Sequence, residues 1–348
     1  MYELLRYDQP RDGLKVPYLV LNLLDPLVDA GDVMQTIDST ISSLDGVELA
    51  SFDSDPLYDY RAQRPVVDYE DGSIVDFTLP QMRLMLYTDV TGKNFLYLCG
   101  HEPDFRWSAV AREVLNIIDK FGVEHVISYA AMPATVPHTR PADMLIRSTR
   151  PIDSVSHVKA SITHYGSLSD YVEYLVRDNE KTAVANLRVR VPFYMARGPF
   201  PFVSGALAAL KMTASLGGPT LPLGDLEQIE DRQLAQGVEI AAQSPEFAEL
   251  VRKLERDYDM QSTELGFART SDDELNIPSS DEIGRAAELF LEMQAENPLQ
   301  RAFGDGSHDE SPLASKDKLP GEKDFNLGSV APRRRRGRHA RPRDDERP

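Results

Sequence analysis

The chain has 348 residues and a formal net charge of −18, so its body should repel nucleic acids and anionic membranes outside any local basic patch. A single cysteine, Cys99, excludes an intramolecular disulfide and a multi-cysteine metal site, and we expect it to be a small buried side chain. No apolar run approaches the length of a membrane span, and the first residues lack the pattern of a secretory signal. We therefore expect a soluble cytoplasmic protein.

The first half of the sequence alternates short apolar runs with helical periods. Buried strands are predicted at Val16–Leu24, Val47–Phe52, Met82–Thr88, Phe95–Cys99 and Val126–Ala130. Helix faces are predicted from Val33 to Leu44 and from Trp107 to Phe121, the second ended by Gly122. A strand, helix and strand in succession predict a parallel pair joined by a right-handed crossover. The pattern indicates an α/β protein with a site at the strand ends.

Two further features lie within this half. Residues 53–69 are rich in Asp, Tyr, Arg and Pro, which is typical of an exposed loop and would allow the 53–64 part to cover a neighbouring subunit. Asp71-Gly72 predicts a β-hairpin between Val66–Tyr69 and Ser73–Phe77. The short turn before Phe95 predicts antiparallel pairing of Leu84–Tyr87 with Phe95–Leu98.

The second half begins with a strand at Met144–Ser148 and a short helix at Ser167–Val176. Leu187–Met195 is a predicted strand in which Pro192 favours an edge or a bulge. The small-residue-rich helix Ser204–Leu216 is expected to lie close to the sheet or to a partner.

From Leu221 onward only helical patterns follow. They lie at 225–241, after the N-cap Ser244-Pro245, and after the capping box Ser279-x-x-Glu282. We predict an α/β core at 1–220, a helical extension at 221–303 and a disordered, Arg-rich tail at 304–348.

The segment after Val330 carries eight Arg against three acids, a net charge of +5 that leaves about −23 on the rest. Two interpretations stay open: the tail folds back on the acidic body, which we favour, or it binds an anionic partner such as a nucleic acid. We expect no nucleic-acid binding elsewhere in the chain.

Motifs with defined chemistry are absent from the sequence. It has no phosphate-binding loop, no G-x-G-x-x-G after a strand, no nucleophile elbow and no His pair at metal-binding spacing, so we expect no cofactor and no metal. Gly100-His101-Glu102 follows the Phe95 strand, where His101 and Glu102 would serve as an acid–base pair. The alternative is a polar turn in which Glu102 or Asp104 caps the following helix.

A second candidate is the loop Pro137-His138-Thr139-Arg140. Its hydroxyl, imidazole and guanidinium groups would hold an anion or carboxylate, together with Gly100 and Glu102 if the two loops share one sheet edge. The alternative is a proline-stiffened loop that Arg140 pins to an acidic neighbour.

The segments GHEPDFRW and EHVISYAAMPATVPHTRP resemble the bacterial, actinobacterial-type branch of the proteasome assembly chaperone family. The matching residues are Gly100, Glu102, Pro103, Trp107 and the run from His138 to Pro141, and the resemblance covers roughly residues 15 to 260. It implies a phosphorylase/hydrolase-like mixed sheet sandwiched by helices, with the later helices as a C-terminal appendage.

The resemblance and the missing catalytic motifs favour a non-enzymatic, assembly-chaperone-like protein that binds other proteins. The alternative is a phosphorylase- or hydrolase-like enzyme acting on a small anionic substrate at the strand ends. A homo-oligomer is expected, with a trimer as the first expectation, because folds of the phosphorylase type often trimerise.

Overall fold

The computed structural model describes residues 4–7, 13–151, 165–198 and 200–265, with side chains described as far as residue 260. All of them belong to one unit, Met1–Asn297, whereas the second unit, Pro298–Pro348, lies outside the described residues. The capping box at Ser279 and the Arg-rich tail also lie outside them. The division at residues 220 and 303 stays a prediction.

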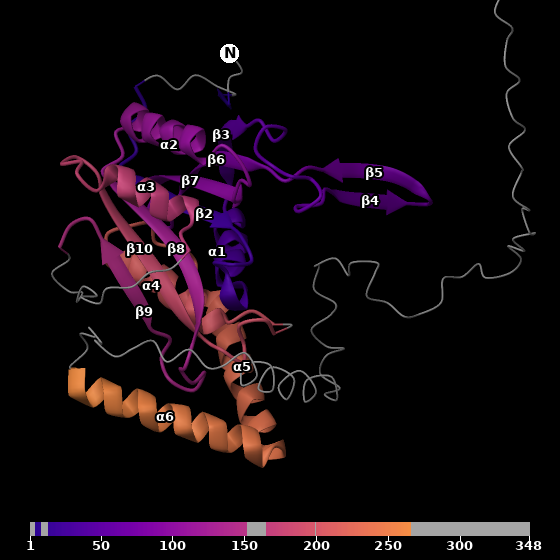
Figure 1. Ribbon diagram of the computed structural model, residues 1–348, viewed down its shortest axis with the longest axis vertical. Coiled ribbons are helices and arrows are strands. Elements are labelled where there is room, and N and C mark those ends of the chain that lie inside the picture. Colours follow the sequence, from indigo (N-terminus) through magenta and orange to yellow (C-terminus); the bar gives the residue numbers. More distant parts are fainter. Residues whose placement is uncertain (1–3, 8–12, 152–164, 199, 266–348) are drawn as a thin grey trace, which may run out of the picture. The chain divides into compact units, whose positions relative to one another are not determined.

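A single mixed sheet of eight strands forms the centre of this unit (Figure 1). Its order is β1-β3-β6-β7-β2-β8-β10-β9, and the pairs β7–β2, β2–β8 and β8–β10 are parallel. The strands are β1 (Leu5–Tyr7), β2 (Tyr18–Leu24), β3 (Gly46–Phe52), β6 (Met82–Thr88), β7 (Asn94–His101), β8 (His125–Ala134), β9 (Met144–Ser148) and β10 (Ala183–Pro192). All five strands predicted in the first half are confirmed, with β8 extending four residues beyond Ala130.

The predicted pairing of the strands before and after the Trp107 helix is wrong. β7 and β8 are parallel but not neighbours, because β2 lies between them: Leu21 is opposite Leu98 on one side and Ser128 on the other. The crossover therefore passes over a strand that comes earlier in the chain. The antiparallel pairing of β6 with β7 is confirmed, with Leu84 opposite Leu98.

Helices cover both faces of the sheet (Figure 1). The short 3₁₀ helix η1 (Ala30–Asp32), α1 (Val33–Ser42) and α4 (Val203–Ser215) contribute to one core. On the other face, α2 (Trp107–Phe121) and α3 (Leu168–Val176) form a second core. The predicted fold class is thereby confirmed, since a mixed sheet lies between two helical layers. None of the described helices combines the length and the apolar character needed to cross a membrane.

Strand β2 illustrates why these strands are nearly all apolar. Leu19, Leu21 and Leu23 pack into the α2–α3 core, while Val20 packs into the α1–α4 core. Asn22 is also fully buried on this strand, and its amide donates to the carbonyl of Met34 (3.0 Å) and to the hydroxyl of Tyr97 (2.9 Å). Tyr97 in turn donates to Asp38 Oδ1 (2.6 Å), so a polar chain links the sheet to α1.

Strand β10 is not an edge strand, contrary to the expectation from Pro192. It lies between β8 and β9, and Pro192 is its last residue, where the missing N–H costs the sheet little. The expected closeness of α4 to the sheet is confirmed: a Cβ on Gly205 would lie 2.8 Å from Val189 Cγ1 of β10.

The last two described helices are α5 (Gly224–Gln243) and α6 (Pro245–Leu265). The predicted cap is present, since Ser244 Oγ accepts a hydrogen bond from the backbone N–H of Phe247 (3.3 Å). Apolar side chains of both helices form a third core with the residues that follow β10: Phe193, Tyr194, Ile240, Phe247, Val251 and Leu254. These helices are the predicted C-terminal appendage.

The predicted hairpin is also confirmed. Strands β4 (Val66–Glu70) and β5 (Ser73–Thr78) form a separate two-stranded sheet, drawn as its own ribbon in Figure 1. All the side chains of β5 are exposed.

The polar chain from Asn22 to Asp38 gives a direct test of how the sheet is held to α1. Tyr97→Phe removes the hydroxyl that donates to Asp38 and accepts from Asn22, and leaves both groups poorly satisfied inside the protein. We expect a loss of about 1–3 kcal/mol in the free energy of unfolding, measured by urea denaturation. Tyr69→Phe on the exposed hairpin is the matched control and should change stability by less than about 0.5 kcal/mol.

Candidate functional site

Glu102 is buried at the carboxyl end of β7, where its carboxylate caps a helix other than the predicted one. Glu102 Oε1 accepts a hydrogen bond from the backbone N–H of Leu168, the first residue of α3. Burial, with smaller contributions from the charges of Asp25 and Asp170, raises the pKa of Glu102 to about 7, although the hydrogen bond from Leu168 lowers it. The helix that follows in sequence, α2, begins after Arg106 without a side-chain cap. The predicted capping of α2 is therefore wrong, and Asp104 instead accepts from the backbone N–H of Asp59 (2.7 Å).

His101 and Glu102 do not form a pair, because successive side chains at a strand end point to opposite faces of the sheet. Glu102 contacts α3, which covers one face. His101 is exposed and lies within the electrostatic influence of Asp38 on α1, which covers the other face, although partial desolvation still lowers the pKa of its ring. The structure does not bring the two groups together for a shared proton transfer.

Gly100 has a structural role at this strand end. Its φ is +116°, and a Cβ at this position would lie 1.9 Å from the carbonyl oxygen of Gln81, the residue before the neighbouring strand β6. Only glycine fits this conformation and this close approach.

The loop between β3 and β4 is less exposed than its composition predicted. Leu57 and Tyr58 are buried, the Tyr58 hydroxyl donates to the carbonyl of His101 (2.8 Å), and Gln63 Nε2 donates to the carbonyl of Glu102 (2.9 Å). This loop therefore holds the end of β7 from within the same chain.

The loop 137–141 binds α6. Arg140 donates through Nε and Nη2 to both carboxylate oxygens of Asp259 (2.9 and 2.7 Å) and through Nη1 to Glu255 (3.0 Å). Thr139 donates to the same Glu255 carboxylate, and the Tyr258 hydroxyl donates to the carbonyl of Pro141 (3.0 Å). This is the geometry expected if Arg140 pins the loop to an acidic neighbour.

His138 is buried between this loop and the helical appendage. Tyr194 contacts it twice, since its hydroxyl accepts from the backbone N–H of His138 (3.0 Å) and lies 2.7 Å from Nδ1. The ring stacks on Phe247, and a Cβ on Gly237 of α5 would lie 2.4 Å from Nε2. No described residue hydrogen-bonds to Nε2, and burial lowers the pKa of His138 to about 4.

The two predicted groups have different surroundings. Glu102 binds α3, whereas His138, Thr139 and Arg140 bind α5, α6 and Tyr194. Leu21 of β2 is opposite Leu98 of β7 and Ser128 of β8. β7 ends three residues after this level, at His101, whereas β8 ends six residues after it, at Ala134. At about 3.3 Å per residue, the loop after β8 begins about 10 Å farther out than the turn after β7.

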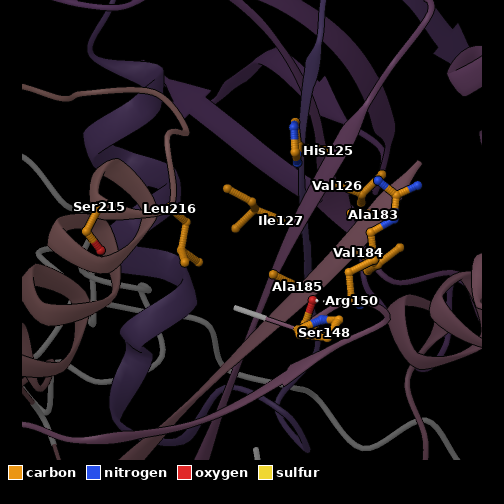
Figure 2. A pocket seen from close by; sticks show the side chains of 11 residues that line it. His125, Val126, Ile127, Ser148, Arg150, Ala183, Val184, Ala185, Ser215 and Leu216 are labelled. Atoms are coloured by element: carbon orange, nitrogen blue, oxygen red, sulfur yellow. Dashed lines mark hydrogen bonds between the residues drawn. The ribbon is translucent and has the colours of Figure 1, made fainter. Parts of the chain in front are cut away.

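A pocket that the sequence did not indicate lies at the opposite edge of the parallel strands, where β8 and β10 begin (Figure 2). It has a volume of about 320 Å³, and His125, Ile127, Ser148, Arg150 and Leu216 are among its lining residues. The Arg150 guanidinium donates to the carbonyl of Glu180, and the His125 ring stacks on Tyr18. Among the described residues, no group of three His, Cys, Asp or Glu side chains is placed to hold a metal ion.

The raised pKa of Glu102 predicts a pH-dependent stability. Glu ionises near pH 4.5 in the unfolded chain, but buried Glu102 ionises near pH 7. The contribution of Glu102 to the free energy of unfolding is therefore complete below pH 4.5 and is lost as the pH rises toward 7. Glu102→Gln keeps an acceptor for Leu168 and should be more stable than the parent at pH 8, by up to about 3 kcal/mol. Urea unfolding at pH 5 and pH 8 measures the difference, with Glu113→Gln as the control; an equal effect of Glu102→Gln at both pH values would contradict it.

The lowered pKa of His138 predicts the opposite dependence. The folded protein keeps this ring neutral down to about pH 4, whereas His in the unfolded chain is protonated below about pH 6.5. The contribution of His138 to the free energy of unfolding is therefore present above pH 6.5 and is lost as the pH falls toward 4. An NMR titration of the His138 ring should show no protonation between pH 7 and pH 5. A midpoint near 6.5 in the folded protein would show that the ring is not buried as described.

Comparisons with known proteins agree with this architecture. The family model described as "PAC2 family" matches residues 23–254. A Corynebacterium glutamicum protein of unknown function has 31% identity over 75% of this chain and 99% of its own, with a TM-score of 0.70. A Mycobacterium tuberculosis protein of unknown function has 29% identity over 75% and 91% of the two chains, with a TM-score of 0.66.

A second M. tuberculosis protein, described as a proteasome-assembly chaperone homologue, has 23% identity over 67% of this chain and 99% of its own, with a TM-score of 0.60. This level of identity shows a shared fold. None of the curated proteins matches the chain significantly. The family model covers most of the α/β core together with α5 and the first half of α6. This chain therefore belongs to the PAC2 family.

Proposed function

We propose that the chain is a non-enzymatic, assembly-chaperone-like protein that acts by binding other proteins. The observation that carries the proposal is that polar groups of the predicted strand-end site are engaged in holding helices. Glu102 caps α3, and Arg140 binds two carboxylates of α6. A substrate would have to displace these contacts. In a protein that binds other proteins, the same contacts would hold α3 and α6 in place, so that the surfaces these helices present are fixed.

Family membership supports the same proposal, since one protein of this fold is described as a proteasome-assembly chaperone homologue. We infer that the partners of this chain are protein subunits and that the chain itself forms a homo-oligomer, with a trimer as the first expectation. The competing function, an enzyme for a small anionic substrate, requires Gly100, Glu102, His138, Thr139 and Arg140 to converge on one ligand. It also requires His101 and Glu102 to act on that ligand as an acid–base pair.

Affinity capture of the tagged full chain from extracts of its native cells, followed by mass spectrometry, tests the proposal. The expected result is enrichment of the subunits of one assembly. These subunits should be recovered more in their unassembled form than in the finished assembly. The comparison bait is Arg140→Ala, which should loosen α6 and so identify partners that depend on the appendage.

The enzyme alternative is tested with thermal melting in the presence of phosphate, nucleosides and nucleotides. A ligand at 100 times its dissociation constant adds about 2.7 kcal/mol of stability. Such a shift with one of these ligands, together with no enriched protein in the capture, would overturn the proposed function.

A further inference from the structure

The pocket where β8 and β10 begin lies on one face of the sheet. Residues directly opposite each other share a face, and the opposed pairs are His125–Ala183, Ile127–Ala185 and Ala185–Ser148. Since residues two apart in a strand also share a face, all five belong together. Ile127 is part of the core beneath α1 and α4, so this is the face that α1 and α4 cover.

The pocket exists because α4 ends before it covers this part of the face. Farther along β10, Leu187 is fully buried on the same face, whereas Ala183 and Ala185 are only half-buried. α4 ends at Ser215, and Ser215 and Leu216 line the pocket from the helix side (Figure 2). The two alanines have small side chains, so the space between the sheet and the end of the helix stays unfilled.

Most of the pocket lining is apolar. Val126, Ile127, Val184 and Leu216 contribute to it, and a Cβ on Gly218, in the turn after α4, would lie 2.7 Å from Ile127 Cδ1. None of the described residues that line the pocket is acidic. An apolar lining with a few polar groups is typical of a pocket that binds a small molecule.

The two ionisable side chains of the pocket are both basic. Arg150 Nη2 donates to the carbonyls of Asn179 (3.5 Å) and Glu180, and no described carboxylate forms an ion pair with it. These carbonyls hold the guanidinium without neutralising its charge. The His125 ring stacks on Tyr18, with 5.0 Å between the ring centroids. In a chain with a net charge of −18, this pocket therefore favours a negatively charged ligand.

The size and the donors of the pocket narrow the class of ligand. A volume of about 320 Å³ holds about ten non-hydrogen atoms at about 30 Å³ each. A single guanidinium matches a carboxylate, which accepts two parallel hydrogen bonds from it. Phosphate groups are often bound by the N–H groups at a helix N-terminus, but α4 meets the pocket with its carboxyl end. Its last carbonyls are occupied, since Leu216 N–H donates to Met212 (3.0 Å) and Gly218 N–H to Thr213 (3.0 Å).

We propose that this pocket binds a small aliphatic monocarboxylate of about six to ten carbons. The carboxylate pairs with Arg150, and the alkyl chain packs on Ile127, Ala185 and Leu216. This site goes beyond the proposed function and is independent of it. It lies at the amino ends of β8 and β10, whereas Glu102 and Arg140 follow the carboxyl ends of β7 and β8.

Equilibrium dialysis of the full chain against radiolabelled octanoate tests the proposal. Octanoate has ten non-hydrogen atoms and should bind saturably, with one molecule per chain. Unlabelled octanoate should displace it. The same concentration of octylammonium, which has the alkyl chain but the opposite charge, should not. Inorganic phosphate, which has the charge but no alkyl chain, should not displace it either.

Two variants locate the binding in this pocket. Arg150→Gln keeps a donor for the neighbouring carbonyls but removes the charge, and should weaken octanoate binding at least about tenfold. Ala185→Leu fills the pocket and should abolish binding. The matched controls are Arg61→Gln, whose parent side chain is 85% exposed, and Ala235→Leu on the exposed surface of α5, and both should bind as the parent does. Circular dichroism verifies that each variant is folded.

Each other result would overturn the proposal. Absence of saturable binding by the parent removes the site, and binding that survives Ala185→Leu places octanoate elsewhere. Binding that survives Arg150→Gln alone, or equal displacement by phosphate or octylammonium, removes the proposed ligand class. None of these results affects the capture of protein partners, so failure of this site and failure of the proposed function are distinguishable.

Discussion

The position of β2 at the centre of the sheet is the constraint on which the rest of the structure depends. This strand pairs with β7 on one side and β8 on the other, and its two faces contribute to two separate cores. Because both faces of this strand are buried, its side chains must be apolar or internally hydrogen-bonded. Asn22 meets this requirement through Met34 and Tyr97. Both helical layers are thereby fixed to one strand.

The ends of the parallel strands then become points of attachment for helices. Glu102 at the end of β7 holds the start of α3, and the loop after β8 holds α6 through Thr139 and Arg140. Both attachments place a buried or partly buried polar group against a partner within the chain. Residue types that look catalytic in the sequence can therefore be required by packing alone, since buried polar groups need partners.

Glu102 and His138, one in each of these two regions, titrate differently because burial acts oppositely on acids and bases. Burial favours the neutral form, so it raises the pKa of Glu102 to about 7 and lowers that of His138 to about 4. The first shift weakens the fold as the pH rises, and the second weakens it as the pH falls. Together they favour maximal stability between these values, with α3 and the appendage responding to opposite changes in pH.

The sequence by itself determined the five strands of the first half, the hairpin and the cap at Ser244, because each depends on residues close together in the chain. The apolar runs predicted the five strands, Asp71-Gly72 predicted the β4–β5 turn, and Ser244-Pro245 predicted the start of α6. Periodicity also gave the buried faces of α2 and α6. The family resemblance added the helical layers on both sides of the sheet.

Only the tertiary structure decided strand order and the partners of the polar residues. The insertion of β2 between β7 and β8 involves strands about 75 and 105 residues apart, and no local pattern encodes it. The alternation of side chains at the end of β7 separated His101 from Glu102, and the longer β8 carried His138 and Arg140 to α6. Local sequence fixes backbone conformation through neighbouring residues, whereas the meeting of distant side chains is fixed by how the sheet and the helices pack together.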